Sequence, residues 1–224
     1  MTIMHFSRRS ADDTLQMEWN NCVEWASRNK LPLNISKCRT LSIVTKKNLV
    51  PTQVVSCDGS SLPEVSELKL LGVTFSSSLK WNTHVKNIIS KASRRMYIIR
   101  NLKRSGCSAE LIFRSYVSFI RSIILYAYPC FCNLPTYLQK QLVRIENRVL
   151  RIMNSDDLYP DLSSAAERAC VKLFKRIEHD ANHPLRTMFD IQSPNQTRST
   201  CILRPPFAKT KRFYDSFIRF YVYR

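Results

Sequence analysis

The chain has 224 residues and a formal net charge of +18. The length suits one domain with an extension or two small domains. The charge points to a polyanionic partner, with nucleic acid as the first candidate and an acidic membrane surface as the second. With 44% hydrophobic residues and 3 glycines, the composition argues against wholesale disorder and against a glycine-rich phosphate loop. No apolar run reaches the roughly 20 residues that span a bilayer, and the N-terminus lacks the pattern of a secretory signal, so we expect a cytoplasmic or nuclear protein without a membrane partner.

The first part of the chain is predicted to combine short strands with one helix. Leu15, Trp19 and Val23 recur at helical spacing, which predicts a helix over 14–29. Runs of apolar and β-branched residues between turn signals predict short strands. These strands cover residues 2–6, 40–45, 54–56 and 68–75.

From Leu79 onward the apolar spacing predicts long helices. Gly106 is expected to end the first of them, and Ser108 stands where it can cap the second. A third helix is predicted over 138–152 and a fourth over 163–180, whereas much of 184–210 has the composition of a loop. The apolar face predicted for the second helix consists of Leu111, Ile112, Tyr116, Phe119 and Ile123.

Positive charge is concentrated in the middle of the chain. Residues 80–153 contain 14 basic and 2 acidic residues (+12), against 9 and 7 (+2) for residues 1–79 and 12 and 8 (+4) for residues 155–224. Surface helices normally mix both signs, so this imbalance favours phosphate contact over an ordinary solvated helix face. The candidate nucleic-acid-binding residues belong to the first long helix and its start: Lys80, Lys86, Lys91, Arg94, Arg95, Arg100, Lys103 and Arg104.

The 8 cysteines are scattered, so we predict reduced, mostly buried thiols rather than a disulfide framework. Cys130 and Cys132, with His179 and His183, could supply zinc ligands. No second cysteine pair has zinc-knuckle spacing, however, so no metal site is predicted.

The aromatic residues have two possible roles. His84 is interpreted as structural, and Trp25 and Trp81 as core anchors rather than base-stacking platforms. Aromatic residues interleave with basic ones over 211–224, which suits either RNA stacking or an amphipathic helix.

Several segments, taken in order, match motifs of one polymerase family. Residues 25–40 (WASRNKLPLNISKCRT) resemble its fourth palm motif, 68–73 (LKLLGV) its primer-grip strand, and 79–91 (LKWNTHVKNIISK) the start of its thumb. Residues 116–126 and 142–152 are similar to later thumb helices. By the order and spacing of these segments, the chain resembles the reverse transcriptases of non-LTR (jockey- or LINE-like) retrotransposons.

The resemblance implies an α+β fold in three parts. A small antiparallel palm remnant over 1–78 would be followed by an α-helical thumb bundle over 79–154. A partly ordered helical and loop extension over 155–224 would complete the chain.

The resemblance also implies substrate-binding residues. Lys37 matches the motif lysine that lies near the nucleoside triphosphate and assists departure of pyrophosphate. Leu71, Gly72 and Val73 match the primer grip, where Gly72 would let a nucleic-acid backbone approach closely.

Catalytic residues are not expected in this chain. Nucleotidyl transfer needs carboxylates that hold two Mg²⁺ ions, and in the family an aromatic-Ala-Asp-Asp turn precedes a strand like residues 2–6, so the chain is expected to begin just after that turn. Its own aspartate pairs, at 12–13 and 156–157, are interpreted as helix starts that complement the helix dipole. We therefore expect no metal or cofactor in this fragment, while Mg²⁺ belongs to the intact parent enzyme.

The predicted function is a fragment of an RNA-directed DNA polymerase of a mobile element, which holds the primer–template but lacks the catalytic carboxylates. Expected partners are an RNA/DNA duplex or hybrid, bound through phosphates, and the missing upstream half of the polymerase. Two alternatives remain: a non-enzymatic RNA- or DNA-binding protein that reuses the thumb surface, and a decayed gene product without a selected function.

Overall fold

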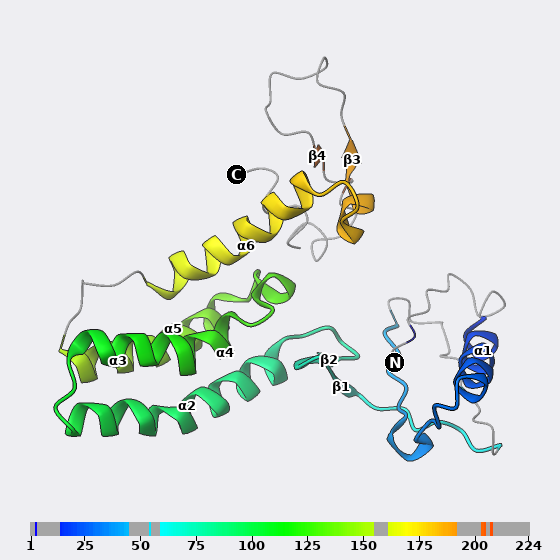
Figure 1. The fold of residues 1–224 in the computed structure, drawn as a ribbon, viewed down its shortest axis with the longest axis horizontal. Helices are drawn as coiled ribbons and strands as arrows, with labels where there is room; N and C mark the ends of the chain where they lie inside the picture. Colours follow the sequence, from blue (N-terminus) through cyan, green and yellow to red (C-terminus); the bar gives the residue numbers. More distant parts are fainter. Residues whose placement is uncertain are drawn as a thin grey trace. The chain divides into compact units, whose positions relative to one another are not determined.

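A computed structural model describes residues 3, 14–44, 54, 59–154, 161–191, 203–204 and 207. The chain divides into two compact units, residues 1–84 and 85–224, which we call the N-terminal and C-terminal units. The described residues are mostly helical, with small two-stranded antiparallel sheets, so the fold is α+β (Figure 1). Among these residues no helix is both long enough and apolar enough to cross a bilayer.

Helix α1 (Leu15–Arg28) is the main element of the N-terminal unit and confirms the predicted helix. It buries Trp19, which packs in a small cluster with Val54 and Leu62. The helix ends where Lys30 takes a left-handed backbone conformation (φ 56°) and the Leu31 N–H donates to the carbonyl of Ala26 at 2.9 Å. This hydrogen bond satisfies a carbonyl that the last turn of the helix would leave unpaired.

Strands β1 (Glu67–Leu70) and β2 (Val73–Ser76) form an antiparallel hairpin, so the prediction of one strand over 68–75 was wrong. The chain reverses at Leu71 (φ 46°) and Gly72 (φ 88°). Positive φ at both central residues matches the right-handed twist of the flanking strands, which is why such turns close hairpins.

The other predicted strands of this unit are reduced or fall outside the described residues. Thr40 makes a single parallel bridge with Glu64, and residues 41–44 have no regular structure. Most of the strands predicted at 2–6 and 54–56 lies outside the described residues.

His84 joins the hairpin to the first turn of the following helix. Its Nδ1 accepts a hydrogen bond from the Thr74 backbone N–H at 3.2 Å, and its side chain is buried. The Trp81 ring lies 5.8 Å from that of Phe75 and 6.0 Å from that of His84, measured between ring centroids. The structural interpretation of His84 is therefore confirmed.

Helix α2 (Asn82–Arg104) follows the predicted apolar spacing. Its buried side chains recur every three or four residues, as a helix that packs along one face requires. They are Val85, Ile88, Ala92, Met96 and Ile99. Gly106 (φ 73°) ends the helix, as predicted. The Gly106 N–H donates to the Lys103 carbonyl, and the Cys107 N–H donates to the Leu102 carbonyl, both at 3.1 Å. These bonds satisfy carbonyls in the last turn of the helix.

The second predicted helix is interrupted by a π-helical turn. Helix α3 (Ala109–Tyr116) is capped by Ser108, continues as the turn η3 (Val117–Arg121) and ends as α4 (Ser122–Leu125). A π turn adds one residue, which moves later side chains round the helix axis. The buried residues are Ile112, Phe113, Tyr116, Ile120 and Ile124. The predicted apolar face is therefore wrong from the π turn onward, at Phe119 and Ile123, and it is also wrong at Leu111, which is 47% exposed.

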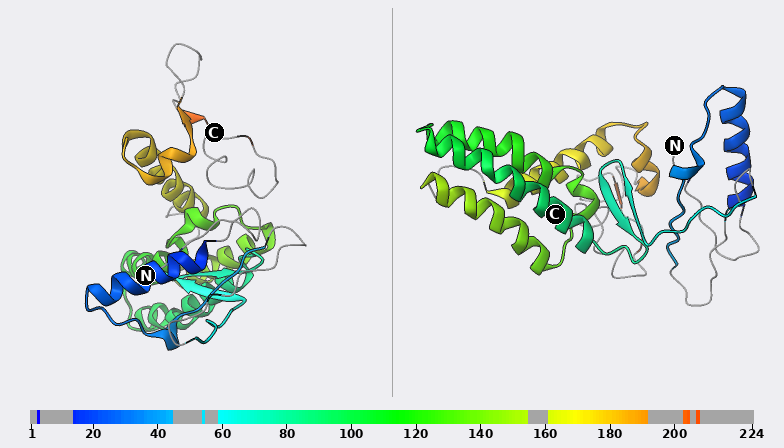
Figure 2. Two further views of the ribbon diagram at one scale, coloured as in Figure 1. Left: turned by 90° about the vertical axis from the view of Figure 1, so that its right-hand side faces the viewer. Right: turned by 90° about the horizontal axis from the view of Figure 1, so that it is seen from below.

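Helices α5 (Thr136–Met153) and α6 (Leu162–His179) confirm the third and fourth predicted helices. The short turn η4 (Tyr128–Phe131) precedes α5, and η5 (Pro184–Met188) follows α6. Figures 1 and 2 show α2, α3 and α5 running alongside one another, and α6 extending away from them. Its first residue lies beside α5, because the Leu162 N–H donates to the Glu146 carboxylate. The short strands β3 (Asp190–Ile191) and β4 (Leu203–Arg204) pair after α6.

Candidate nucleic-acid interface

The cations predicted on the first long helix are all exposed. Lys80 lies in the N-terminal unit, and the other seven lie on α2 within the C-terminal unit. Because each residue of a helix turns by about 100°, these side chains point in several directions. Arg94 lies opposite the buried residues, whereas Lys103 lies near their side, at the end of the helix. One cation also has a structural contact, since the Arg95 guanidinium donates to the Phe119 carbonyl at 2.8 Å.

Helix α5 carries a second set of exposed cations that sequence reasoning did not single out. They are Lys140, Arg144, Arg148 and Arg151. Their spacing of four, four and three residues places them on one stripe. Leu138, Leu142, Ile145 and Val149 are buried on the opposite side of the same helix. The spacing was visible in the sequence and could have identified this stripe.

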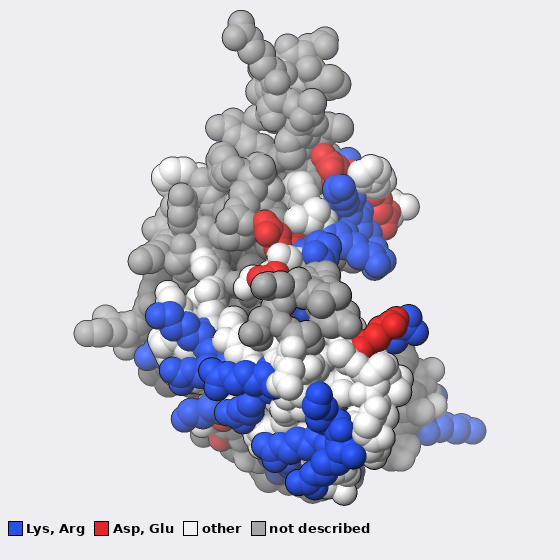
Figure 3. Space-filling view, turned by 90° about the vertical axis from the view of Figure 1, so that its left-hand side faces the viewer, with Lys and Arg blue, Asp and Glu red and all other residues white. Residues whose placement is uncertain are grey.

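Together the exposed Lys and Arg side chains of α2 and α5 in the C-terminal unit form what we call the basic helical surface. Figure 3 shows blue side chains spread over the end of the helical part with few red ones among them. The surface consists of Lys86, Lys91, Arg94, Arg95, Arg100, Lys103, Arg104, Lys140, Arg144, Arg148 and Arg151.

Each of the two acidic residues of the 80–153 segment forms an ion pair with an arginine. Glu110 pairs with Arg114 at 2.6 Å on the surface of α3. Glu146 pairs with the buried Arg121. Subtracting these two arginines from the 14 basic residues of the segment leaves 12, which face no carboxylate from residues 80–153. The basic helical surface therefore keeps its positive potential.

A hollow of about 310 Å³ runs beside the α5 stripe. It is lined by Thr136, Gln139, Lys140, Val143, Arg144, Asn147 and Ser163. Two of the stripe cations thus stand next to neutral hydroxyl and amide groups, which can donate hydrogen bonds to phosphate or sugar oxygens. A second hollow, of about 390 Å³, lies at the end of α1 and is lined mostly by apolar side chains and backbone, with Lys30 as its charged residue.

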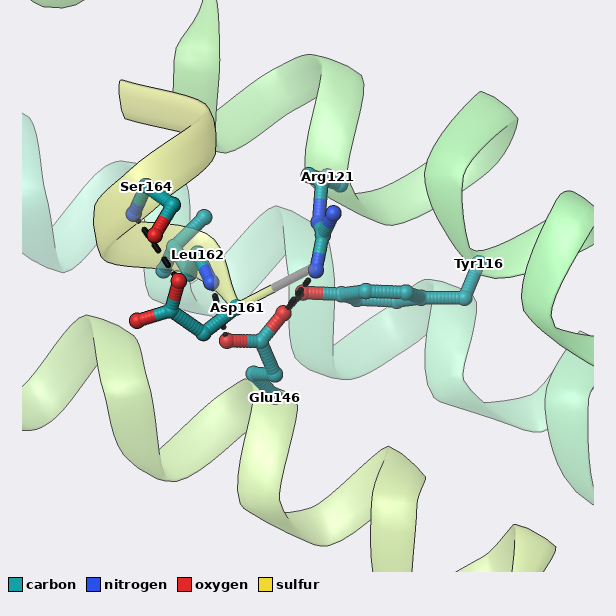
Figure 4. Close-up of polar contacts among 6 residues, drawn as sticks. All are labelled: Tyr116, Arg121, Glu146, Asp161, Leu162 and Ser164. Atoms are coloured by element: carbon teal, nitrogen blue, oxygen red, sulfur yellow. Dashed lines mark hydrogen bonds and ion pairs between the residues drawn. The ribbon is translucent and has the colours of Figure 1, made fainter. Parts of the chain in front are cut away.

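A buried polar network fixes the position of α5 relative to its neighbours (Figure 4). Glu146 accepts hydrogen bonds from the Tyr116 hydroxyl at 3.1 Å, from Arg121 and, through its other oxygen, from the Leu162 N–H at 2.6 Å. These partners come from α3, the π turn and the start of α6. Asp161 caps α6 by accepting from the Ser164 N–H at 3.0 Å.

The network keeps its charges away from the surface. Arg121 is 5% exposed and Glu146 3%; the Arg121 guanidinium carbon lies 5.1 Å from the centre of the Tyr116 ring. Burial, followed by the charge of Glu146, raises the pKa of Tyr116. Burial opposes the charge of Arg121, but hydrogen bonds with Tyr116 and Glu146 outweigh it and raise its pKa. Arg121 is thus a structural cation that cannot reach a phosphate.

The residues matched to the palm motifs lie in separate elements of the N-terminal unit. Lys37 is exposed at the end of the short 3₁₀ helix η2 (Ile35–Lys37). Leu71, 83% exposed, and Gly72 form the hairpin turn, whereas Val73 is buried at the start of β2. The backbone of the turn itself requires positive φ at Gly72, which gives the glycine a reason independent of any ligand.

Two expectations about side-chain burial were wrong. Trp25 is 53% exposed, because Trp19 and not Trp25 lies on the buried side of α1. The six described cysteines are free, as predicted, but of these only Cys170 is buried.

The Cys132 thiol has a raised pKa. The larger cause is its hydrogen bond with Cys170, and burial is the second cause.

Within the described part of the chain, no three His, Cys, Asp or Glu side chains gather as they would around a metal ion. The aspartate pairs at 12–13 and 156–157 lie outside the described residues.

No protein-family model matches the chain, and no curated protein or solved structure is similar enough to it to count as a match.

Proposed function

We propose that this chain binds duplex or hybrid nucleic acid through its phosphates, as the primer–template-holding part of an RNA-directed DNA polymerase of a mobile element. The observation that carries the binding proposal is the basic helical surface, where exposed Lys and Arg side chains of α2 and α5 lie among few acidic residues. Phosphate contacts supply most of the affinity in sequence-independent binding, and a surface of one sign concentrates a polyanion beside it.

The link to a polymerase rests on the order of the palm-like and thumb-like segments in the sequence. On this proposal the helical part would hold the duplex, and Lys37 and the Leu71–Gly72 turn would belong to the neighbouring palm. A non-enzymatic RNA- or DNA-binding protein with the same surface is the second candidate, because the binding chemistry requires no other part of the polymerase.

The binding proposal is tested by the dependence of affinity on salt. If about four to six phosphates are neutralised, the logarithm of the association constant should fall with the logarithm of salt concentration at a slope of about −4 to −5 on duplex DNA. A variant with Lys86, Lys91, Arg94 and Arg104 changed to Gln should shallow the slope by about two to four units, while Gln preserves the helix. Arg95 is left in place because it bonds the Phe119 carbonyl.

Equal slopes for the two proteins would show that α2 presents only a solvated face. A wild-type affinity that does not respond to salt would overturn the whole binding proposal.

The expectation that this chain has no polymerase activity is tested separately. We expect no incorporation of nucleotides on a primed RNA template with Mg²⁺ or Mn²⁺, because such transfer needs metal-binding carboxylates beyond those the sequence offers. Template-dependent extension that disappears when Asp12 or Asp13 is changed to Asn would contradict this expectation.

A further inference from the structure

The outer face of α5 differs from that of α2 in its geometry. Lys140, Arg144, Arg148 and Arg151 lie on one stripe opposite the buried residues, whereas the cations of α2 point to several sides of their helix. From first to last the stripe extends about 16 Å along the helix axis. Over the same length, one strand of a duplex contains about five nucleotides. A straight row of cations is suited to follow one nucleic-acid backbone.

An exposed aromatic ring stands at the N-terminal end of this stripe. Tyr137 is 53% exposed, and it shares the face of the cations because Lys140 and Arg144 follow it by three and seven residues, which is one and two turns of the helix. An exposed ring beside a row of cations is the arrangement on which unpaired bases stack. In a duplex the faces of the bases are covered by their neighbours, so a ring beside the backbone of a strand can stack only on an unpaired base.

The hollow beside the stripe adds neutral hydrogen-bonding groups. Gln139 and Asn147 from α5 and Ser163 from the start of α6 line it together with Lys140 and Arg144. A backbone that follows the stripe would therefore meet amide and hydroxyl groups along one edge as well as cations, which is the mixture found in phosphate and sugar contacts.

We propose that the outer face of α5 holds one nucleic-acid strand, with its phosphates on Lys140, Arg144, Arg148 and Arg151 and an unpaired base stacked on Tyr137. This inference rests on the proposed nucleic-acid binding and specifies its substrate: a duplex with a single-stranded overhang, or a single strand, rather than a blunt duplex. The role of Tyr137 is to recognise the unpaired nucleotide, and the four cations contribute sequence-independent affinity.

The test uses the full chain and three probes of random sequence: a blunt RNA–DNA hybrid, the same hybrid with an overhang of about five nucleotides, and a single strand of that overhang sequence. Wild-type protein should prefer the overhang probe to the blunt one. Tyr137→Ala should weaken binding to the overhang probe about tenfold, which is the effect of removing one base stack. The same change should alter binding to the blunt hybrid by less than about twofold, and Tyr137→Phe should retain the preference because the ring remains.

Two matched controls accompany this variant. Tyr97→Ala removes another exposed tyrosine, which lies on α2 and is 65% exposed, and it should leave the overhang preference unchanged. Changing the four α5 cations to Gln removes as many charges as the α2 variant described above, and it should shallow the salt slope on the overhang probe by about two to four units.

The outcomes separate this inference from the proposed function. If wild-type protein binds all probes with a steep salt slope, but Tyr137→Ala or the α5 charge variant behaves like wild type on the overhang probe, the inference is wrong and nucleic-acid binding stands. If wild-type protein shows no salt-dependent binding to any probe, both are wrong. Loss of overhang preference in both Tyr137→Ala and Tyr97→Ala would also overturn the specific role of Tyr137.

Discussion

Leu71 has a backbone conformation that suits its side chain poorly. Its φ of 46° lies in the left-handed region, and its side chain is 83% exposed at the tip of the β1–β2 hairpin. A β carbon in this region approaches the following carbonyl oxygen, which costs about 1–2 kcal/mol for an ordinary residue. Asparagine tolerates the region better, and Asn-Gly is the preferred pair for a two-residue turn of this kind.

We therefore predict that Leu71→Asn stabilises the protein by about 0.5–1 kcal/mol, since little apolar burial is lost with the exposed leucine. Leu71→Val should destabilise it, because a β-branched side chain is still less compatible with positive φ. Thermal or urea unfolding of the three proteins measures both effects. A lower stability for Leu71→Asn would mean that the leucine side chain makes a contact worth more than the relief of strain.

Glu146 is the residue on which the helical part depends most. Its carboxylate balances the buried Arg121 and accepts from Tyr116 and from the first turn of α6. Removing one member of a buried pair leaves an uncompensated charge, which costs about 3–5 kcal/mol, whereas replacing both members can be nearly neutral.

Glu146→Gln should therefore destabilise the protein by about 3 kcal/mol, because the amide keeps the shape but leaves Arg121 without its counter-charge. The double variant Arg121→Met with Glu146→Gln should recover part of this loss. Urea denaturation of the two variants and wild type gives the comparison. The account of this pair fails if the double variant is less stable than Glu146→Gln alone.

Helix α6 begins with a side-chain cap, while α1 does not. Asp161 accepts a hydrogen bond from the Ser164 N–H at 3.0 Å. At the start of α1, Thr14 makes no side-chain cap hydrogen bond. Hydrogen bonds from the Ser164 side chain and, second, from the Ser164 backbone N–H lower the pKa of Asp161 in the folded protein. A carboxyl group with a lowered folded pKa contributes stability above its unfolded pKa and loses it as the pH falls through the folded pKa.

At neutral pH, Asp161→Ala should destabilise the protein by about 1 kcal/mol. The difference from wild type should shrink as the pH falls below the ordinary aspartate range, about pH 4, because the wild-type carboxylate becomes protonated there. Thr14→Ala is the matched control and should have little effect at any pH. Unfolding curves between pH 7 and pH 3 test both, and a difference for Asp161→Ala that persists unchanged at pH 3 would contradict the capping role of the charged form.

Across the whole molecule, apolar periodicity predicted the helices well and the turns between them only in part. Gly106 and Ser108 marked the boundary of α2 and α3 because both act through local hydrogen bonds. The reversal at Leu71 was missed, since leucine is an unusual residue at positive φ and the apolar run continues through it. The exposed position of Trp25 was also missed, because Trp19 and Trp25 both fit a helical pattern and only tertiary packing separates them.

The candidate interface was also predicted only in part from the sequence. The cations of α2 were identified from the excess of basic over acidic residues in 80–153, and the structure places all of them at the surface. The burial of Arg121 was not foreseen, since the π turn that carries it inward leaves no clear periodic signal. The α5 stripe was visible as a spacing, but its relation to Tyr137 and to the hollow beside Ser163 depends on how α5 and α6 meet.

The most direct test of the central claim is a lysine footprint of the full chain with and without a random-sequence RNA–DNA hybrid. An amine-reactive reagent modifies exposed lysines, and mass spectrometry measures each site. Binding through the basic helical surface should reduce modification of Lys86, Lys91, Lys103 and Lys140. It should leave Lys172 and Lys175, which are exposed on α6 and outside that surface, unchanged. Equal modification of all six lysines with and without the hybrid, or protection confined to the two on α6, would contradict the account.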